Sequence, residues 1–322
     1  MIARFDNILN KGVSLYKNKW LRIIAQLIIL GICALYVNRY SNEIMALTKE
    51  LDVNFFRIIL AWLVLSIVYI FIGTSSWWCI LKGLGEAPNW IDSAQIQMNS
   101  TLAKYIPGYV WQYVGKAIMS KEIGIGSGIS GIAMTFELFQ TILVGIGFAC
   151  IAFSIQNNQN VYGFSDFHEV ALPLGILIVL AAYSSVLIIP RFIPRALKIN
   201  TYRLKYLFAS LALITVGWIM LSTSFWVIGT SLSPSISAQD LPTFMLSTSM
   251  AMVGGILLIL VPNGLGVREG IMVVVLGNII GVPLAIMFAV ITRLFVTVCE
   301  LTSAFIVSYI HRNFKRRKAD IA

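Results

Sequence analysis

An almost unbroken apolar run, residues 241–282, is interrupted once by a short segment of helix breakers and charges. The interrupting residues include Pro262, Gly264, Gly266, Arg268 and Glu269. A helix breaks here because proline lacks the amide hydrogen and glycine adopts backbone angles closed to other residues. Broken backbone is tolerated at membrane depth only where it is buried in protein or lines a wet cavity. The segment is therefore a candidate substrate site, and the alternative is a tight turn between two ordinary spanning helices.

The composition of the chain is too hydrophobic for a soluble globular protein. Hydrophobic residues make up 58% of the 322 residues, charged residues 12%, and the mean hydropathy is +0.84. Such values predict a polytopic membrane protein. The formal charge of +10 does not indicate nucleic acid as a partner, because lysine and arginine cluster at the ends of apolar segments, as positive-inside topology requires. The four cysteines all lie in apolar segments without CxxC spacing, so we expect no metal site and no cofactor.

Six apolar segments predict full transmembrane helices, and their flanking charges predict the orientation. The segments are residues 20–37, 56–81, 129–155, 170–189, 206–230 and 283–310. Basic residues precede the first segment, follow the fourth and fill the tail after the last, residues 311–322. Both termini are therefore expected in the cytoplasm. Trp77 and Trp78, near the end of the second segment, are expected to anchor it at the membrane interface.

A second interruption lies between the second and third segments, at residues 89–128. Many of its residues are polar, and it contains Pro107 and Gly108 with Lys104 before them and Gly115 and Lys116 after them. Two readings remain open: a re-entrant hairpin, or a cytoplasmic loop with an amphipathic helix at the membrane surface. If both interrupted segments crossed completely, the chain would have eight transmembrane helices.

The two interruptions occupy matching positions in two halves of the chain. Three predicted spans fall in residues 20–155 and three in residues 170–310, and each half has its Pro-Gly interruption between its second and third spans. An odd number of spans per half makes the second half inverted relative to the first. Inverted repeats with Gly/Pro-interrupted segments at matching positions point to a transporter's substrate site. The predicted fold is thus an all-α membrane domain of two inverted repeats, with about six spans and two re-entrant hairpins.

Two charges lie at similar depth in the third spans of the two halves. Glu137 is about nine residues from one membrane face and Arg293 about ten from the other, so each is roughly 13 to 15 Å deep at ~1.5 Å per residue. Intramembrane charges are usually functional. We therefore expect Glu137 and Arg293 to face each other or to line one polar cavity, with a purely structural ion pair as the alternative.

The residue types near the interruptions suit an anionic headgroup. Lysines supply point charges, Arg268 could bind a phosphate through two hydrogen bonds, and helix amino-termini after Gly108 and Gly266 present free amide donors. Sugars would also suit the tryptophan and tyrosine side chains nearby, although these aromatics could serve only as interfacial anchors. A position between opposed hairpins fits an amphiphile whose tail stays in lipid.

These motifs resemble the flippase-like membrane domain of lysylphosphatidylglycerol synthases and their stand-alone relatives, over nearly the whole chain. The resemblance rests on Pro262 to Glu269, and on Lys104 to Gly108 together with Gly115 and Lys116. It implies a protein of a bacterial or archaeal cytoplasmic membrane that moves a lipid between leaflets. The implied lipid is an anionic phospholipid or a polyprenyl-linked glycolipid. Asn263 and Lys116 depart from the family pattern, where a small residue and arginine are expected.

Other functions remain alternatives. The chain could be a membrane-embedded transferase, with Glu137 and Glu269 as its acid or base candidates, but no HExxH, Ser-His-Asp or Asp-rich metal motif supports one. It ends soon after its last span, so a soluble aminoacylating domain is not expected. It could also be an accessory subunit that organises glycan assembly without transporting anything, with glycosyltransferases or other envelope-assembly proteins as partners.

Overall fold

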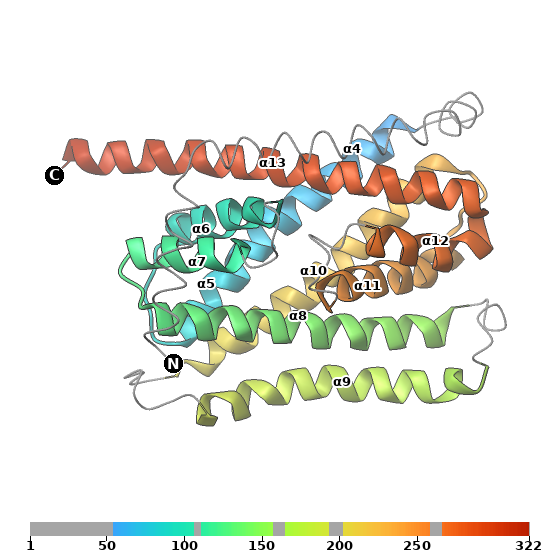
Figure 1. Cartoon of the computed structure of the whole chain (residues 1–322), viewed down its shortest axis with the longest axis horizontal. Coiled ribbons are helices and arrows are strands. Elements are labelled where there is room, and N and C mark those ends of the chain that lie inside the picture. Colours follow the sequence, from blue (N-terminus) through green and yellow to red (C-terminus); the bar gives the residue numbers. More distant parts are fainter. Residues whose placement is uncertain (1–53, 106–110, 157–164, 193–201, 258–265, 322) are drawn as a thin grey trace.

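The structure is a computed structural model that describes residues 54–105, 111–156, 165–192, 202–257 and 266–321. Every regular element in these residues is a helix. The first predicted span, residues 20–37, lies outside them. Figure 1 shows a bundle in which α8 and α9 run side by side, α13 runs roughly parallel to them along the opposite side, and other helices cross at an angle.

Within the described residues, five helices are long and apolar enough to cross a membrane. They are the span formed by α4 (Phe55–Ile67) with α5 (Thr74–Gly83), then α8 (Ser127–Ile155), α9 (Ser165–Phe192), α10 (Leu204–Leu232) and α13 (Val282–Ile321). The 29 residues of α8 extend about 43 Å, which exceeds a hydrocarbon core of about 30 Å. The five later predicted spans are therefore confirmed as helices. α13 also continues through the predicted tail at 311–322, as far as Ile321.

Four shorter helices form two pairs. The first pair is α6 (Trp90–Leu102) and α7 (Trp111–Glu122), with a 3₁₀ turn, η2 (Ala103–Tyr105), after α6. The second pair is α11 (Leu241–Leu257) and α12 (Val267–Ile280), preceded by the 3₁₀ turn η5 (Ala238–Asp240). α11, the longest of the four with 17 residues, extends only about 25 Å, less than the hydrocarbon core.

The two pairs lie at opposite ends of the bundle. Figure 1 shows α6 and α7 near the end of α5, and α11 and α12 at the other end, with α13 and α8 running past both pairs. The packing agrees, because α8 contacts α7 and α11 whereas α13 contacts α12 and α6. Each long helix thus packs against its own preceding short helix and against one from the other half of the chain.

Two local features shape the bundle. The second span contains a π-helical segment, η1 (Val68–Gly73), of a kind often found at functional sites. α8 and α9 approach closely where two glycines meet, because a Cβ added to Gly175 would lie 2.8 Å from the Gly147 carbonyl oxygen. Small residues at helix contacts are typical of membrane proteins.

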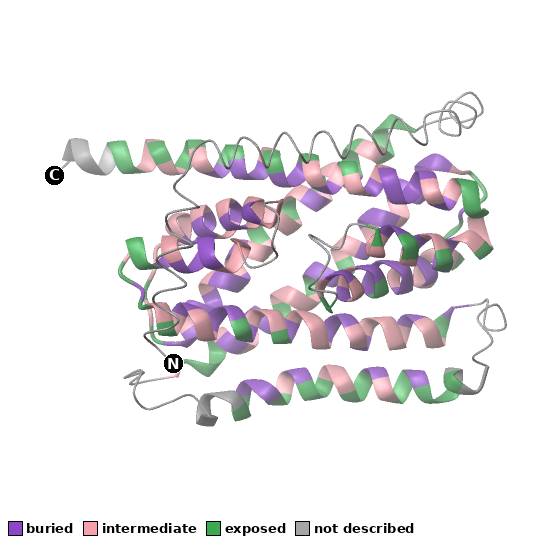
Figure 2. Ribbon diagram, in the orientation of Figure 1, coloured by how far each residue is buried: buried purple, intermediate pink, exposed green. Residues whose placement is uncertain are grey.

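Large apolar side chains cover the outside of the bundle. Leu177 and Leu180 on α9 and Phe305 on α13 are each more than half exposed. Figure 2 shows the exposed positions along the outer sides of α9 and α13, and most buried positions toward the interior. An outer surface of this kind fits contact with lipid chains rather than water.

Candidate functional site

The first turn of α12 begins at Gly266, whose backbone requires glycine. Its φ is +80°, a left-handed conformation that side chains with a Cβ rarely adopt. The Gly266 N–H donates to Oε2 of Glu269 at 2.7 Å, which closes a capping interaction at the amino-terminus of the helix. The predicted break at Gly266 is therefore confirmed. Glu269, in the first turn of α12, stabilises the start of that helix.

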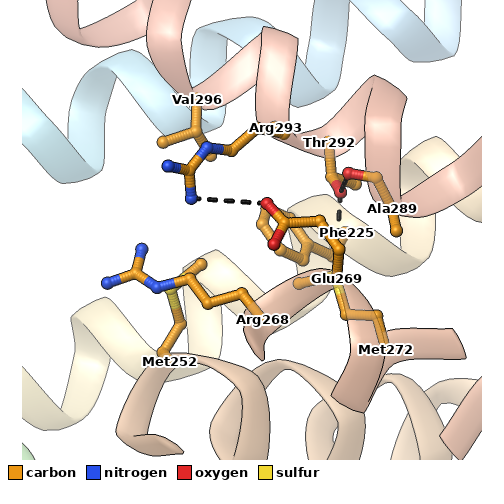
Figure 3. Close-up of a pocket in the computed structure, with 9 residues that line it drawn as sticks. All are labelled: Phe225, Met252, Arg268, Glu269, Met272, Ala289, Thr292, Arg293 and Val296. Atoms are coloured by element: carbon orange, nitrogen blue, oxygen red, sulfur yellow. Dashed lines mark hydrogen bonds and ion pairs between the residues drawn. The ribbon is translucent and has the colours of Figure 1, made fainter. Parts of the chain in front are cut away.

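Glu269 also reaches α13. Its Oε1 lies 3.5 Å from Nη1 of Arg293, and both side chains line a small pocket with a volume of about 20 Å³. The pocket is formed by Phe225, Met252, Arg268, Glu269, Met272, Ala289, Thr292, Arg293 and Val296. Figure 3 shows the guanidinium groups of Arg268 and Arg293 extending to the same side of this pocket.

Arg268 is positioned by a glycine on the neighbouring helix. A Cβ added to Gly255 of α11 would lie 2.4 Å from Nε of Arg268 and 2.8 Å from its Cγ. The arginine side chain therefore crosses α11 at a position where that helix has no side chain of its own. Gly255 creates the space that directs Arg268 into the pocket.

A second polar group joins the first pair of short helices to α13. Lys104 of η2 forms an ion pair with Glu300, whose other oxygen accepts a hydrogen bond from the Tyr105 hydroxyl at 2.8 Å. The same hydroxyl lies 3.2 Å from Oγ1 of Thr297. Tyr69, in the π-helical segment, also contacts Glu300. Both ends of the bundle thus contribute side chains to one buried region.

The two groups form one electrostatic unit. Lys104 interacts electrostatically with Arg268 and Arg293 as well as with Glu300. We call Lys104, Arg268, Glu269, Arg293 and Glu300 the central cluster. It contains three cationic side chains and two carboxylates. Arg268 and Arg293 each make a further contact.

Glu137 lies in a separate ion pair. It accepts from Lys116 of α7 on one oxygen and from Nε2 of Gln97 on the other, at 3.3 Å. Arg293 pairs with Glu269 instead, so the structural Glu137–Arg293 ion pair, the alternative reading of the sequence, is wrong. Both charges do sit inside spanning helices, but each one binds a partner from the short helix that precedes its own span.

Lys116 is buried over an aromatic ring. Its Nζ lies 3.7 Å from the ring centroid of Trp77, and Trp77 has no solvent exposure. The interface anchor expected at Trp77 is therefore wrong, since the indole supports a buried cation. Trp78 does lie near the end of its span, and it donates to the carbonyl oxygen of Pro88 at 3.0 Å.

The remaining predicted site residues are distributed as follows. Gly115 is buried on α7, one residue before Lys116. Pro107, Gly108, Pro262 and Gly264 lie outside the described residues. Among the described residues, no three His, Cys, Asp or Glu side chains come together as a metal site.

Sequence reasoning missed Glu300, Tyr69 and Gly255. Glu300 carried a usable signal, because an acidic residue inside an apolar span is a candidate functional residue on its own. It also lies seven residues after Arg293, which places both on one face of a helix. Tyr69 and Gly255 carried no comparable signal, since tyrosine and glycine are common in membrane helices.

The comparison with known protein families agrees with this geometry. A family model described as the lysylphosphatidylglycerol synthase TM region matches residues 23–301. No curated protein matches the chain in sequence. The matched range contains the two pairs of short helices, the central cluster and the Lys116–Glu137 pair. The chain is thus a multi-pass membrane protein that belongs to the family of the lysylphosphatidylglycerol synthase transmembrane region.

Proposed function

We propose that this protein moves a lipid with an anionic headgroup across the membrane, and that the central cluster binds the headgroup. The observation that carries the proposal is that Arg268 and Arg293 line one pocket inside a bundle of apolar spans, in a cluster that also contains Lys104. A charged side chain at membrane depth costs at least ~2.5 kcal/mol and is usually functional. A phosphate beside Arg268 and Arg293 would accept hydrogen bonds from their guanidinium groups.

The two pairs of short helices support the same proposal. We infer that they are re-entrant hairpins of two inverted repeats, because they lie at opposite ends of the bundle and are shorter than the hydrocarbon core. Such hairpins are tolerated where their ends line a polar cavity. The headgroup would then cross beside polar side chains from both hairpins while its tails remained in the bilayer. Family membership favours lipid handling as the general role.

Transport by purified protein tests the proposal. Liposomes containing wild-type protein should move a fluorescent phosphatidylglycerol or a labelled polyprenyl phosphate between leaflets, as measured by the fraction protected from an impermeant quencher. Arg268→Gln should slow this movement at least tenfold without loss of folding. The matched control is Arg57→Gln, because Arg57 lies at the start of α4 and donates to the Thr230 carbonyl oxygen outside the cluster.

Two outcomes would contradict the proposal. Folded wild-type protein that moves neither anionic lipid would exclude translocation of these lipids and favour an accessory role in envelope assembly. Equal rates for Arg268→Gln and Arg57→Gln would exclude the central cluster as the headgroup site. A zwitterionic phosphatidylcholine probe, moved more slowly than the anionic probes, would support selection by charge.

A further inference from the structure

α6 and α13 are joined by polar contacts along most of the length of α6. His311 Nε2 lies 2.9 Å from Oδ1 of Asp92, and the Ser308 hydroxyl donates to Oδ1 of Asn99 at 3.2 Å. The Lys104–Glu300 ion pair continues the series. In these pairs the residue number increases along α6 while it decreases along α13, so the two helices are antiparallel. We call this contact the polar seam.

Two buried polar atoms in the polar seam have no hydrogen-bond partner among the described residues. They are Oε1 of Gln95 and Oγ of Ser303. Gln95 lies three residues after Asp92, and Ser303 three after Glu300, so both share the helix faces that carry the seam. Leaving a buried polar atom unpaired costs about 1–3 kcal/mol. A polar guest that formed hydrogen bonds with both atoms would remove this cost.

In the other half of the bundle, an apolar cluster joins α8 to the second pair of short helices. It includes Ala152 of α8, Leu246 of α11 and Val275 of α12. Gly145 of α8 also approaches Val253 of α11, since a Cβ added to this glycine would lie 2.6 Å from Cγ2 of Val253. The α6–α13 contact also has an apolar cluster, which includes Ala94, Met98, Ala304 and Val307, and it adds the polar contacts of the seam to that cluster.

We propose that the polar seam is the lateral route by which the lipid headgroup moves between the membrane edge and the central cluster. This inference rests on the proposed function and names the path of the same substrate. From His311 to Arg293, α13 covers about 27 Å at ~1.5 Å per residue, close to the thickness of the hydrocarbon core. Lys104 and Glu300 end the route, because both belong to the central cluster.

The chemistry of passage follows from the contacts. A phosphate that enters between α6 and α13 replaces Glu300 as the partner of the Lys104 ammonium and accepts hydrogen bonds from the Ser308 and Ser303 hydroxyls. During passage Glu300 keeps the hydrogen bond from the Tyr105 hydroxyl, while the headgroup takes over the contacts of Lys104 and Ser308. The tails stay outside, against the apolar face of α13 that carries Phe305.

A reversible cross-link tests this route. In a chain whose four cysteines are replaced by alanine, Asn99→Cys with Ser308→Cys allows a disulfide across the polar seam. Oxidation should slow translocation of fluorescent phosphatidylglycerol at least tenfold, and a reductant should restore it. The control is Phe153→Cys with Phe167→Cys, which joins α8 to α9, where the two rings lie 5.7 Å apart between centroids. Its oxidation should leave the rate unchanged.

A second variant tests the seam without a cross-link. Gln95→Leu with Ser303→Val makes the seam apolar, so it should hold or raise the thermal stability while slowing translocation at least tenfold. Wild-type rates in this variant, or in the oxidised seam cross-link, would overturn the route while leaving the proposed function intact. An inert cysteine-free parent, alongside inert wild-type protein, would instead overturn the proposed function itself.

Discussion

Glu269 connects two helices through a single carboxylate. One oxygen accepts the Gly266 N–H at 2.7 Å and so caps α12, while the other lies 3.5 Å from the Arg293 guanidinium on α13. The charge that fixes the first turn of α12 therefore also fixes the position of Arg293 beside the pocket. Arg268, one residue earlier, depends on the same turn for its direction.

Two substitutions separate the contacts of Glu269. Glu269→Gln keeps an oxygen that can accept from Gly266 but loses the ion pair, whereas Glu269→Ala loses both. Glu269→Ala should therefore lower the free energy of unfolding by about 1 kcal/mol more than Glu269→Gln, the usual contribution of a helix cap. Denaturant unfolding in detergent micelles measures the difference. Equal losses would show that the cap contributes nothing.

Gly255 provides a test of the direction of Arg268. Gly255→Ala adds a methyl group 2.4 Å from Nε of Arg268 and must displace that side chain. Headgroup binding should fall at least tenfold, as measured by the affinity for a short-chain phosphatidylglycerol. The matched control is Gly270→Ala on α12, where a Cβ would meet no atom within 4 Å.

The control variant, Gly270→Ala, also has an expected effect on stability. Alanine favours a helix over glycine by about 0.8–1.0 kcal/mol, so Gly270→Ala should bind normally and unfold at the same or a higher temperature. Normal binding by Gly255→Ala would contradict the assigned role of Arg268.

At the scale of the elements, α7 and α8 are held together by a buried ion pair. Lys116 is 3% exposed, forms an ion pair with Glu137 and lies over the Trp77 ring. Removing one member leaves the other charge buried without its partner, which costs roughly 3–5 kcal/mol. The pair therefore determines how α7 is placed against the span that follows it.

A double-mutant cycle measures this coupling. Lys116→Met and Glu137→Gln should each destabilise the protein, while the double variant should be less destabilised than the sum of the two by about 0.5–3 kcal/mol. Thermal unfolding monitored by tryptophan fluorescence gives the three values. Additive effects would mean that the two side chains do not interact in the folded protein. A double variant that translocates normally would assign the pair to structure alone.

The spans were predictable because apolar length and flanking charge are properties of the sequence alone. Residues 129–155 and 206–230 were expected as helices, and α8 and α10 confirm them within a few residues. The break at Gly266 was predictable for a similar reason, since glycine and proline act locally.

The partners of the charged residues were not predictable. Depth along a span gives the level of Glu137 and Arg293, but the partner depends on how each helix is rotated and on which neighbour packs against it. Lys116 and Glu269 pair with the span that follows each of them, a relation that depth does not reveal. Trp77 was misjudged for the same reason, because a tryptophan near the end of a span can face lipid or protein.

At the scale of the whole molecule, the proposal depends on the opposition of the two pairs of short helices. α6 and α7 lie at one end of the bundle, α11 and α12 at the other, and α8 and α13 pack against members of both pairs. If the membrane normal follows these long helices, the two pairs enter from opposite surfaces and supply Lys104 and Arg268 to one cluster. A bundle with both pairs on one surface would have no such shared site.

The most direct measurement is the side from which each pair of short helices is reached. Glu122→Cys at the end of α7 and Gln239→Cys beside the start of α11 both replace exposed residues, each in the cysteine-free chain. In sealed vesicles of one orientation, a membrane-impermeant maleimide should label one of these cysteines from outside and the other only after permeabilisation. Labelling of both cysteines from the same side would contradict the opposed arrangement, and with it the central cluster as a site for carrying a headgroup across the membrane.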